Sequence, residues 1–146
     1  MIISSARADD LDQILSLEDE GFTRPLRWSR EAWQAELDNA DRLVLVRHDA
    51  RGLVVGVATF SLAADMADLL RVIVAADSRG RGIGGSLIRA GMDWAKAIGA
   101  RRMLLEVEPG NIPAVRTYQK LGFAELDRRR DYYGAGLDAL VMAVKL

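Results

Sequence analysis

The chain has 146 residues, half of them apolar, with 20 basic residues, 21 acidic residues, one histidine and no cysteine. This length fits one domain with a real hydrophobic core, and the near-zero net charge argues against a nucleic-acid-binding protein held by broad electrostatic attraction. The absence of cysteine excludes disulfides, thiol nucleophiles and cysteine-bound zinc. The single histidine, His48, provides too few ligands for a histidine metal site, so we expect no metal.

Hydrophobic spacing in the first forty residues predicts one strand and two helices. Ile2–Ala6 is typical of a short strand, and Asp9–Glu18 has its aliphatic residues spaced for one face of a helix. Gly21–Trp28 contains a proline and no clear period, which indicates a loop. Ser29 follows as a candidate N-cap of the second helix, because a serine oxygen accepts a hydrogen bond from the free amides of a first helical turn.

The middle of the chain is predicted to be a run of strands. Leu43–Val46 and Leu53–Leu62 are rich in β-formers and flank the turn-forming segment Asp49–Gly52, which indicates a hairpin. Leu69–Val74 is a further apolar strand. We expect the strands before Leu69 to form a hairpin meander.

Helices and strands alternate in the last part of the chain. A helix extends from the glycine-rich segment to about Ile98, Met103–Val107 is a strand, and Asn111–Leu121 is a helix with a proline in its first turn and a glycine after its end. Two final strands lie around Phe123–Asp127 and Leu137–Val144. We predict one mixed α/β domain over residues 1–146.

The sequence contains no segment typical of export or of a membrane span. Met1–Ser5 has no basic region and no extended apolar stretch, so it does not resemble a secretory signal. The longest nearly uncharged stretch, Gly52–Ala64, is too short to cross a bilayer. We therefore expect a soluble, cytoplasmic protein with no membrane partner and no direct nucleic-acid partner.

The segment Arg79–Gly85, with the sequence Arg-Gly-Arg-Gly-Ile-Gly-Gly, is the strongest functional pattern in the chain. It lies between the strand Leu69–Val74 and a predicted helix. Glycines let backbone amides approach a ligand closely, and a helix start presents free N–H groups at the positive end of the helix dipole. The segment therefore predicts a site for an anion, most often a phosphate.

A dinucleotide-binding loop is one interpretation of these glycines. Gly80, Gly82 and Gly85 satisfy the pattern G-x-G-x-x-G, and the acidic residue Glu106 ends the next strand. However, a dinucleotide loop follows its strand almost directly, whereas residues 75–79 intervene here, and the preceding strands form a meander rather than βα units. A P-loop is excluded because no Gly-Lys-Ser/Thr follows.

The stretch from Val72 to Phe123 resembles the GNAT family of acetyl-coenzyme A-dependent N-acetyltransferases. The family pattern Arg/Gln-x-x-Gly-x-Gly/Ala is matched by Arg79, Gly82 and Gly84. The order of later residues is most similar to the ribosomal-protein-alanine N-acetyltransferases, with these matches: Leu105–Val107, Asn111, Tyr118, Gly122–Phe123 and Arg129–Tyr133. The resemblance implies a GNAT fold, which is a mixed, mostly antiparallel sheet of about seven strands with a splayed central pair, flanked by about four helices.

The resemblance also implies how acetyl-coenzyme A binds as a cosubstrate. The pyrophosphate would lie on the amides of the glycine turn, and the pantetheine arm would pair with the strand at residues 72–74, where an amide near Val74 would polarise the thioester carbonyl. The cofactor-binding residues implied in this way are Val72, Ile73, Val74, Arg79, Gly80, Arg81, Gly82, Ile83, Gly84, Gly85 and Asn111. Arg81 is equally typical of a solvated surface charge, and Asn111 of a plain helix cap.

Two residues match the catalytic positions of the family. An amine that is protonated at neutral pH cannot attack a thioester, so a base must take its proton, and Glu106 matches that base. Tyr118 matches the general acid that gives a proton to the departing thiolate, and it lies two helical turns after Asn111. With no cysteine or suitable histidine to hold an acetyl group, direct transfer in a ternary complex follows.

The acceptor is the least determined part of the prediction. The resemblance implies a protein N-terminal α-amine, in particular the alanine of a small-subunit ribosomal protein. A small-molecule amine acetyltransferase and a non-catalytic coenzyme A-binding module are the alternatives. Arg71 would repel a cationic amine if it pointed toward the acceptor. Candidates for lining an acceptor groove, each of which could equally serve only the fold or the surface, are Trp28, Glu108, Tyr132, Tyr133 and Glu18–Glu20.

Overall fold

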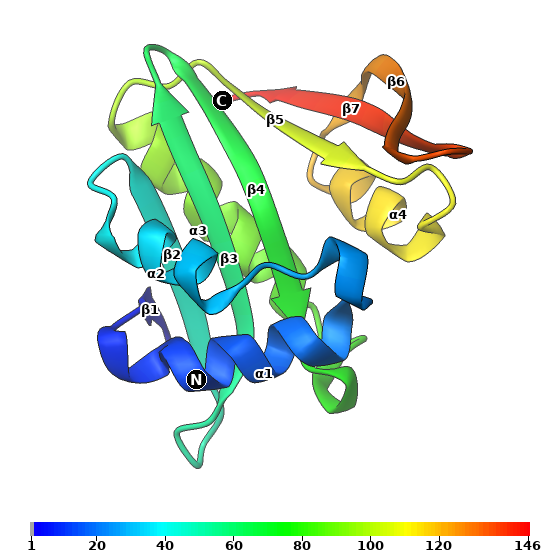
Figure 1. Cartoon of the computed structure of the whole chain (residues 1–146). Helices are drawn as coiled ribbons and strands as arrows, with labels where there is room; N and C mark the ends of the chain where they lie inside the picture. Colours follow the sequence, from blue (N-terminus) through cyan, green and yellow to red (C-terminus); the bar gives the residue numbers. More distant parts are fainter. Residues whose placement is uncertain (1) are drawn as a thin grey trace.

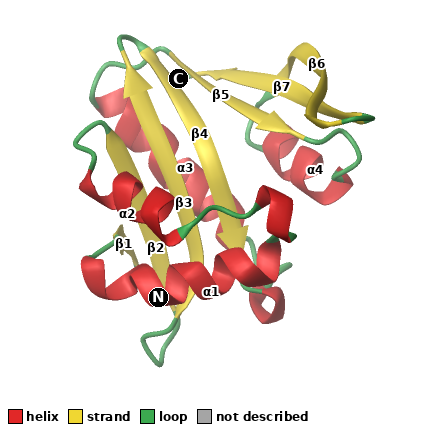
Figure 2. Cartoon of the chain, viewed as in Figure 1, coloured by secondary structure: helices red, strands yellow, loops and turns green. Residues whose placement is uncertain are grey.

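The computed structural model describes residues 2–146, which form one seven-stranded sheet covered by helices on both faces (Figures 1 and 2). The strands are β1 (Ile3–Ser5), β2 (Arg42–His48), β3 (Val54–Ala63), β4 (Met66–Val74), β5 (Arg102–Val107), β6 (Ala124–Gly134) and β7 (Leu137–Lys145). The helices are α1 (Leu11–Gly21), α2 (Arg30–Asp38), α3 (Ile83–Ala97) and α4 (Ile112–Lys120). None of the helices within residues 2–146 is long and apolar enough to cross a membrane.

The sheet is mixed and mostly antiparallel. Its strand order is β1-β2-β3-β4-β5-β7-β6, and only the central pair β4 and β5 is parallel. The crossover between these two strands contains α3, as parallel neighbours require. These features confirm the predicted fold class, with its seven strands and four helices.

The parallel pair separates partway along its length. Pairing between β4 and β5 covers only Met66–Leu69 on one strand and Arg102–Leu105 on the other. Beyond Leu69 a bulge against β3 at Leu70 shifts the register, and the ends of the two strands diverge (Figure 1). A bulge increases local twist and bends a strand, so it contributes to this separation. The predicted splay of the central pair is present.

Helices on the two faces bury separate apolar clusters. In the view of Figure 1, α1 and α2 lie in front of the sheet, where Ile14 and Trp33 are fully buried, and α3 lies behind it. α3 packs so closely that a Cβ on Gly91 would lie 2.2 Å from the Phe60 ring. Tyr118 of α4 belongs to the same rear cluster as α3.

Most predicted elements are present, and the main differences lie at turns. β4 begins at Met66 rather than at Leu69, because a tight hairpin turn at Ala64 joins it to β3. Ala64 adopts φ +56° there, and the turn contains no glycine or asparagine by which the sequence could have predicted it. β6 continues to Gly134, well beyond the predicted end at Asp127, although its residues are largely exposed and charged. Pairing with β7, rather than apolar alternation, defines this strand.

Candidate active site

The glycine turn leads directly into α3. Gly80 and Gly82 adopt φ +79° and +76°, a left-handed conformation that favours glycine, and Gly82 is the N-cap residue of the helix. Ser86 is the first residue of this region whose amide donates a backbone hydrogen bond, to the carbonyl of Gly82 at 3.0 Å. Within the described residues, the amides of residues 80–85 have no such partner. They are therefore available to an anion at the positive end of the helix dipole.

A cleft of about 460 Å³ opens over this turn. We call it the glycine-turn cleft; its lining residues are Val74, Ser78, Arg79, Gly80, Gly82, Ile83, Gly84, Gly85, Arg89, Thr117, Lys120 and Leu121. Seven of the eleven residues implied as cofactor-binding thus line it, whereas Arg81 and Ile73 line neither this cleft nor the cavity described below. The basic residues Arg89 and Lys120, which no sequence motif identifies, add positive charge.

The open edge of β4 presents main-chain groups between the two diverging strands. The Ala75 amide donates to the Val55 carbonyl of β3 at 2.9 Å, and strand residues alternate in direction, so Ile73 also faces β3. Val72 and Val74 therefore direct their N–H and C=O groups toward the gap. Arg79 Nε donates to the Val74 carbonyl oxygen at 3.2 Å, in agreement with this direction. The side chain of Ile73 is buried in the front cluster.

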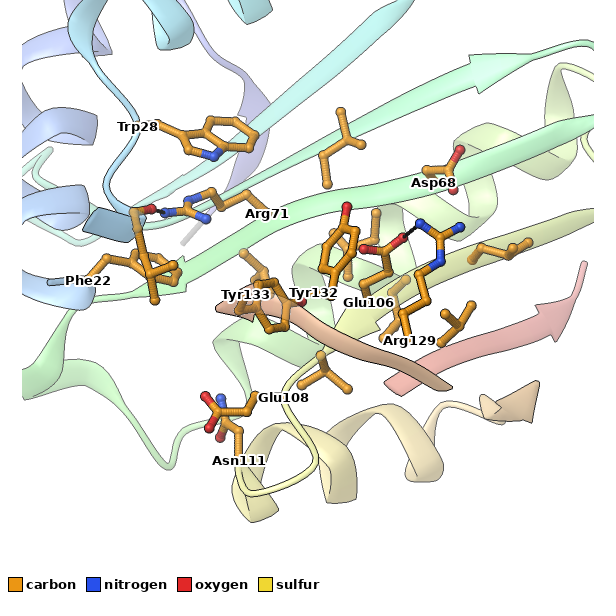
Figure 3. A pocket seen from close by; sticks show the side chains of 18 of the residues that line it. Phe22, Trp28, Asp68, Arg71, Glu106, Glu108, Asn111, Arg129, Tyr132 and Tyr133 are labelled. Atoms are coloured by element: carbon orange, nitrogen blue, oxygen red, sulfur yellow. Dashed lines mark hydrogen bonds and ion pairs between the residues drawn. The ribbon is translucent and has the colours of Figure 1, made fainter. Parts of the chain in front are cut away.

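A second, larger cavity of about 700 Å³ lies where β4 and β5 separate. We call it the central cavity (Figure 3). The residues that line it come from the α1–α2 loop, β4, β5, the β5–α4 loop, α4 and the β6–β7 hairpin, and include Phe22, Leu26, Arg27, Trp28, Asp68, Arg71, Val72, Glu106, Glu108, Asn111, Tyr118, Arg129, Tyr132 and Tyr133. The structure thus brings both residues implied as catalytic into one cavity.

Glu106 lies near the end of β5 with its carboxylate directed into the central cavity (Figure 3). Its Oε1 lies 3.3 Å from Nη1 of Arg129, which extends from β6, and the side chain is 29% exposed. Hydrogen bonding to Glu106, and then its charge, raise the pKa of the Tyr132 hydroxyl. Glu106 is therefore partly solvated and is held by groups from the β6–β7 hairpin.

Tyr118 approaches the cavity from α4. The helix begins after Asn111, whose side-chain oxygen accepts a hydrogen bond from the Ala114 amide at 3.4 Å, so the expected N-cap is present. The Tyr118 ring packs against Phe123 with a centroid separation of 6.1 Å. Burial raises the pKa of Tyr118 to about 12, and burial followed by the charge of Glu106 raises that of Tyr133 to about 12. Both phenols are protonated at neutral pH.

Asp68 adds a second carboxylate to the cavity. It lies on β4 in register with Leu104, two residues before Glu106 on β5, so both carboxylates lie on one face of the sheet. Burial and then the charge of Glu106 raise the pKa of Asp68, while the charge of Arg42 lowers it. The alternation of β4 could have placed Asp68 on this face, but no motif identifies it.

Three arginines (Arg27, Arg71 and Arg129) and three carboxylates (Asp68, Glu106 and Glu108) line the cavity. Each arginine has an ion-pair partner: Asp19 for Arg27 at 3.9 Å, Glu18 for Arg71 and Glu106 for Arg129. Asp68 and Glu108, by contrast, have no ion-pair partner among the described residues. Arg71 does line the cavity, but its charge is balanced, so the expected repulsion of a cationic amine does not arise from it. Glu18, a groove candidate in the sequence, is instead fully buried.

The fold is that of an acetyltransferase. The family model described as "Acetyltransferase (GNAT) family" matches residues 8–123, and the chain belongs to this family. The ribosomal protein bS18-alanine N-acetyltransferase of Escherichia coli (strain K12) is 27% identical over 147 residues, which cover 99% of this chain and 97% of that protein. An N-alpha-acetyltransferase of Sulfurisphaera tokodaii is 39% identical over 79 residues, 53% of this chain and 47% of that protein.

Solved structures show the same architecture. The crystal structure of the ribosomal-protein-S18-alanine N-acetyltransferase from Escherichia coli superposes with a TM-score of 0.88 at 26% identity, covering 99% of this chain and 92% of that one. Arabidopsis thaliana NAA60 in complex with acetyl-CoA has a TM-score of 0.87 at 20% identity, covering 99% of this chain and 98% of that one.

Proposed function

We propose that this chain transfers an acetyl group from acetyl-coenzyme A to the α-amine of a protein N-terminus, with the alanine of a small-subunit ribosomal protein as the first acceptor to test. One observation supports this most: Glu106 and Tyr118 line the central cavity together with Val72 of β4, and Val74 of the same strand lines the glycine-turn cleft. The relatives named for bS18-alanine acetylation share nearly the full length of the chain.

The residues present fit acetyl-coenzyme A. The free amides of residues 80–85 and the basic side chains of Arg79, Arg89 and Lys120 suit the phosphate groups, because backbone N–H groups at a helix start and nearby cations favour anions. The main-chain groups of Val72 and Val74 suit the amides of the pantetheine arm. Bound there, the cosubstrate supplies an acetyl thioester to the gap between β4 and β5.

The central cavity suits a cationic, peptide-linked amine. Asp68 and Glu108, which have no ion-pair partner among the described residues, attract an α-ammonium group, and the walls of Phe22, Trp28 and Tyr133 offer apolar surface to the first residues of a peptide. These two carboxylates of the central cavity favour a cationic amine over an anionic acceptor. The proposed acceptor is therefore an unblocked N-terminus.

Glu106 and Tyr118 divide the proton transfers. Glu106 accepts the proton of the amine, directly or through one water, after the ion pair with Arg129 has opened. The free amine then forms the C–N bond with the acetyl carbon, the nitrogen releases its second proton to solvent as the amide forms, and the C–S bond breaks. Tyr118, protonated because its pKa is about 12, donates to the departing sulfur. The Val74 amide, directed into the gap, is placed to stabilise negative charge on the carbonyl oxygen.

An acceptor assay tests the proposal. The protein is incubated with acetyl-coenzyme A and an alanine-starting peptide from the small ribosomal subunit that also contains one lysine. Thiol release is followed with a thiol reagent, to which the cysteine-free chain adds no background. We expect release that depends on the peptide and an acetyl group on the α-amine.

Two controls separate the alternatives. The same peptide with a blocked N-terminus should give no release, and a panel of polyamines, amino acids and antibiotic amines should react more slowly than the peptide. Faster turnover of a small amine would favour the small-molecule enzyme. Cofactor binding by calorimetry without any product would favour a non-catalytic module.

A further inference from the structure

We propose that Arg71, held by Glu18, is a positioning residue that fixes the α1–α2 loop (residues 22–28) as the acceptor-side wall of the central cavity. Arg71 lies on β4, directly before Val72 and Val74, whose main-chain groups are directed into the gap between β4 and β5. The proposal rests on the proposed function in one respect, which is that a peptide N-terminus occupies this cavity. Its structural part concerns the loop alone.

Glu18 is a fully buried carboxylate with a complete set of donors. Its Oε1 accepts from Arg71 Nε at 3.0 Å and from the Trp33 indole Nε1 at 2.9 Å, and its Oε2 accepts from Arg71 Nη2 at 2.5 Å and from the Trp28 amide at 3.1 Å. A buried charge is tolerated only when it is paired and hydrogen-bonded in this way. Glu18 therefore holds the Arg71 guanidinium in one orientation.

The other contacts of Arg71 are with the loop. Nη2 donates to the Leu26 carbonyl oxygen at 2.6 Å, and the guanidinium carbon lies 3.5 Å from the centroid of the Phe22 ring and 4.7 Å from that of Trp28 (Figure 3). The planar guanidinium can form a forked ion pair with Glu18 and stack on an aromatic ring at the same time. One side chain thus contacts three residues of the loop.

The loop has little regular structure of its own. Its single 3-10 turn covers Arg24–Leu26. Arg27 donates to the Phe22 carbonyl within the loop at 2.7 Å and to the Asp19 carbonyl of α1 at 2.9 Å. The Arg71 contacts instead join the loop to the sheet. Phe22 and Trp28 also pack on the front cluster, where the Trp28 ring lies 5.0 Å from that of Trp33, and the Arg71 contacts add a polar connection that sets the position of the loop relative to β4.

Loss of the connection should act on the acceptor and not on the cofactor. Phe22, Leu26 and Trp28 line the central cavity, and none of the loop residues lines the glycine-turn cleft. A loosened wall would bind the acceptor less tightly and would discriminate less between small and large first side chains. The affinity for acetyl-coenzyme A should stay the same.

The main variant removes both charges, E18Q/R71M, because R71M alone would leave Glu18 buried without a partner and could unfold the chain. R71K is the conservative variant, since a lysine keeps the charge but cannot fork to both oxygens of Glu18 and stack on Phe22. R30M is the matched control. Arg30 joins α2 to α1 through Asp12 at 2.7 Å but lines neither cavity.

Hydrogen exchange of residues 22–28 is the first measurement and needs no activity. We expect faster exchange in E18Q/R71M, an intermediate rate in R71K, and the wild-type rate in R30M. Unchanged exchange in E18Q/R71M would overturn the proposal. If the wild-type chain acetylates no peptide, the proposed acceptor is wrong, and this measurement alone decides the positioning role.

Steady-state kinetics with alanine-starting and methionine-starting peptides are the second measurement. In E18Q/R71M we expect the KM for the alanine peptide to rise about tenfold, the preference for alanine to shrink, and kcat and the KM for acetyl-coenzyme A to stay within about twofold. Changes of similar size in kcat, in the KM for the peptide and in the KM for acetyl-coenzyme A would indicate a general structural role and would contradict the proposal.

Discussion

Replacing Tyr118 by phenylalanine removes the proposed general acid and little else. The ring is 7% exposed and packs on Phe123, and phenylalanine retains these contacts. The Tyr118 hydroxyl has no hydrogen-bond partner among the described residues, so its loss leaves no buried group unpaired. We therefore expect the free energy of unfolding to change by less than about 1 kcal/mol.

The catalytic effect of the same change should be large. A positioned proton donor contributes about 10²- to 10⁴-fold to a rate, so kcat of Y118F should fall by at least about 10²-fold. The KM for acetyl-coenzyme A should stay within about twofold, because the hydroxyl acts on the sulfur only as the C–S bond breaks and not when the intact cosubstrate binds. Initial rates of thiol release over a range of both substrates measure the two constants separately.

Stability at high pH gives an independent check on the environment of Tyr118. Burial raises its pKa from 10 to about 12 in the folded chain, so the folded state retains a proton that the unfolded state loses above pH 10. The contribution of protonated Tyr118 to the free energy of unfolding is complete below pH 10 and is lost as the pH rises through 12. The loss amounts to about 2 to 3 kcal/mol. Urea unfolding should therefore show a smaller loss between pH 10 and 12 in Y118F than in wild type.

Two results would refute this account of Tyr118. Full kcat in Y118F would exclude it as the acid. A rise in the KM for acetyl-coenzyme A as large as the fall in kcat would assign it a structural or binding role instead.

Three further substitutions test other parts of the account. E106Q should lower kcat about 10²-fold at pH 7, with partial recovery at higher pH as the amine loses its proton unaided; a pH–rate profile without recovery would contradict a base role. G82A places a side chain at φ +76° in open space, so it should cost about 1 kcal/mol in urea unfolding and raise the KM for acetyl-coenzyme A but not for the peptide. G91A forces a Cβ to 2.2 Å from the Phe60 ring and should cost about 1 to 3 kcal/mol, with kcat per folded molecule unchanged.

The elements that the sequence predicted well are those with strong local patterns. The α3 helix follows from its apolar period and the glycine turn, and the N-caps Ser29 and Asn111 both accept the expected amide hydrogen bonds, from Ala32 and Ala114. Elements defined by tertiary contact were harder to predict. The hairpin at Ala64 uses a left-handed alanine, and β6 is defined by its pairing with β7 rather than by apolar alternation.

The same contrast holds for the candidate site. Glu106, Tyr118 and the glycine turn were identifiable because they stand in a motif of fixed spacing. The structure places Glu106 and Tyr118 on the central cavity and the glycine turn on the glycine-turn cleft. Asp68 and Arg129 are brought to Glu106 by strand register and by the β6–β7 hairpin. The partner of Arg71 lies 53 residues away in sequence, so no local pattern could show that its charge is balanced by Glu18.

Tandem mass spectrometry of the reacted peptide tests the central claim most directly. The substrate begins with alanine and contains one internal lysine, and the measurement assigns the added acetyl group to one of the two amines. We expect acetylation of the α-amine by the wild-type chain, at a rate lowered at least about 10²-fold in E106Q and in Y118F. Acetylation of the lysine alone, or α-amine acetylation at an unchanged rate in both variants, would contradict this claim.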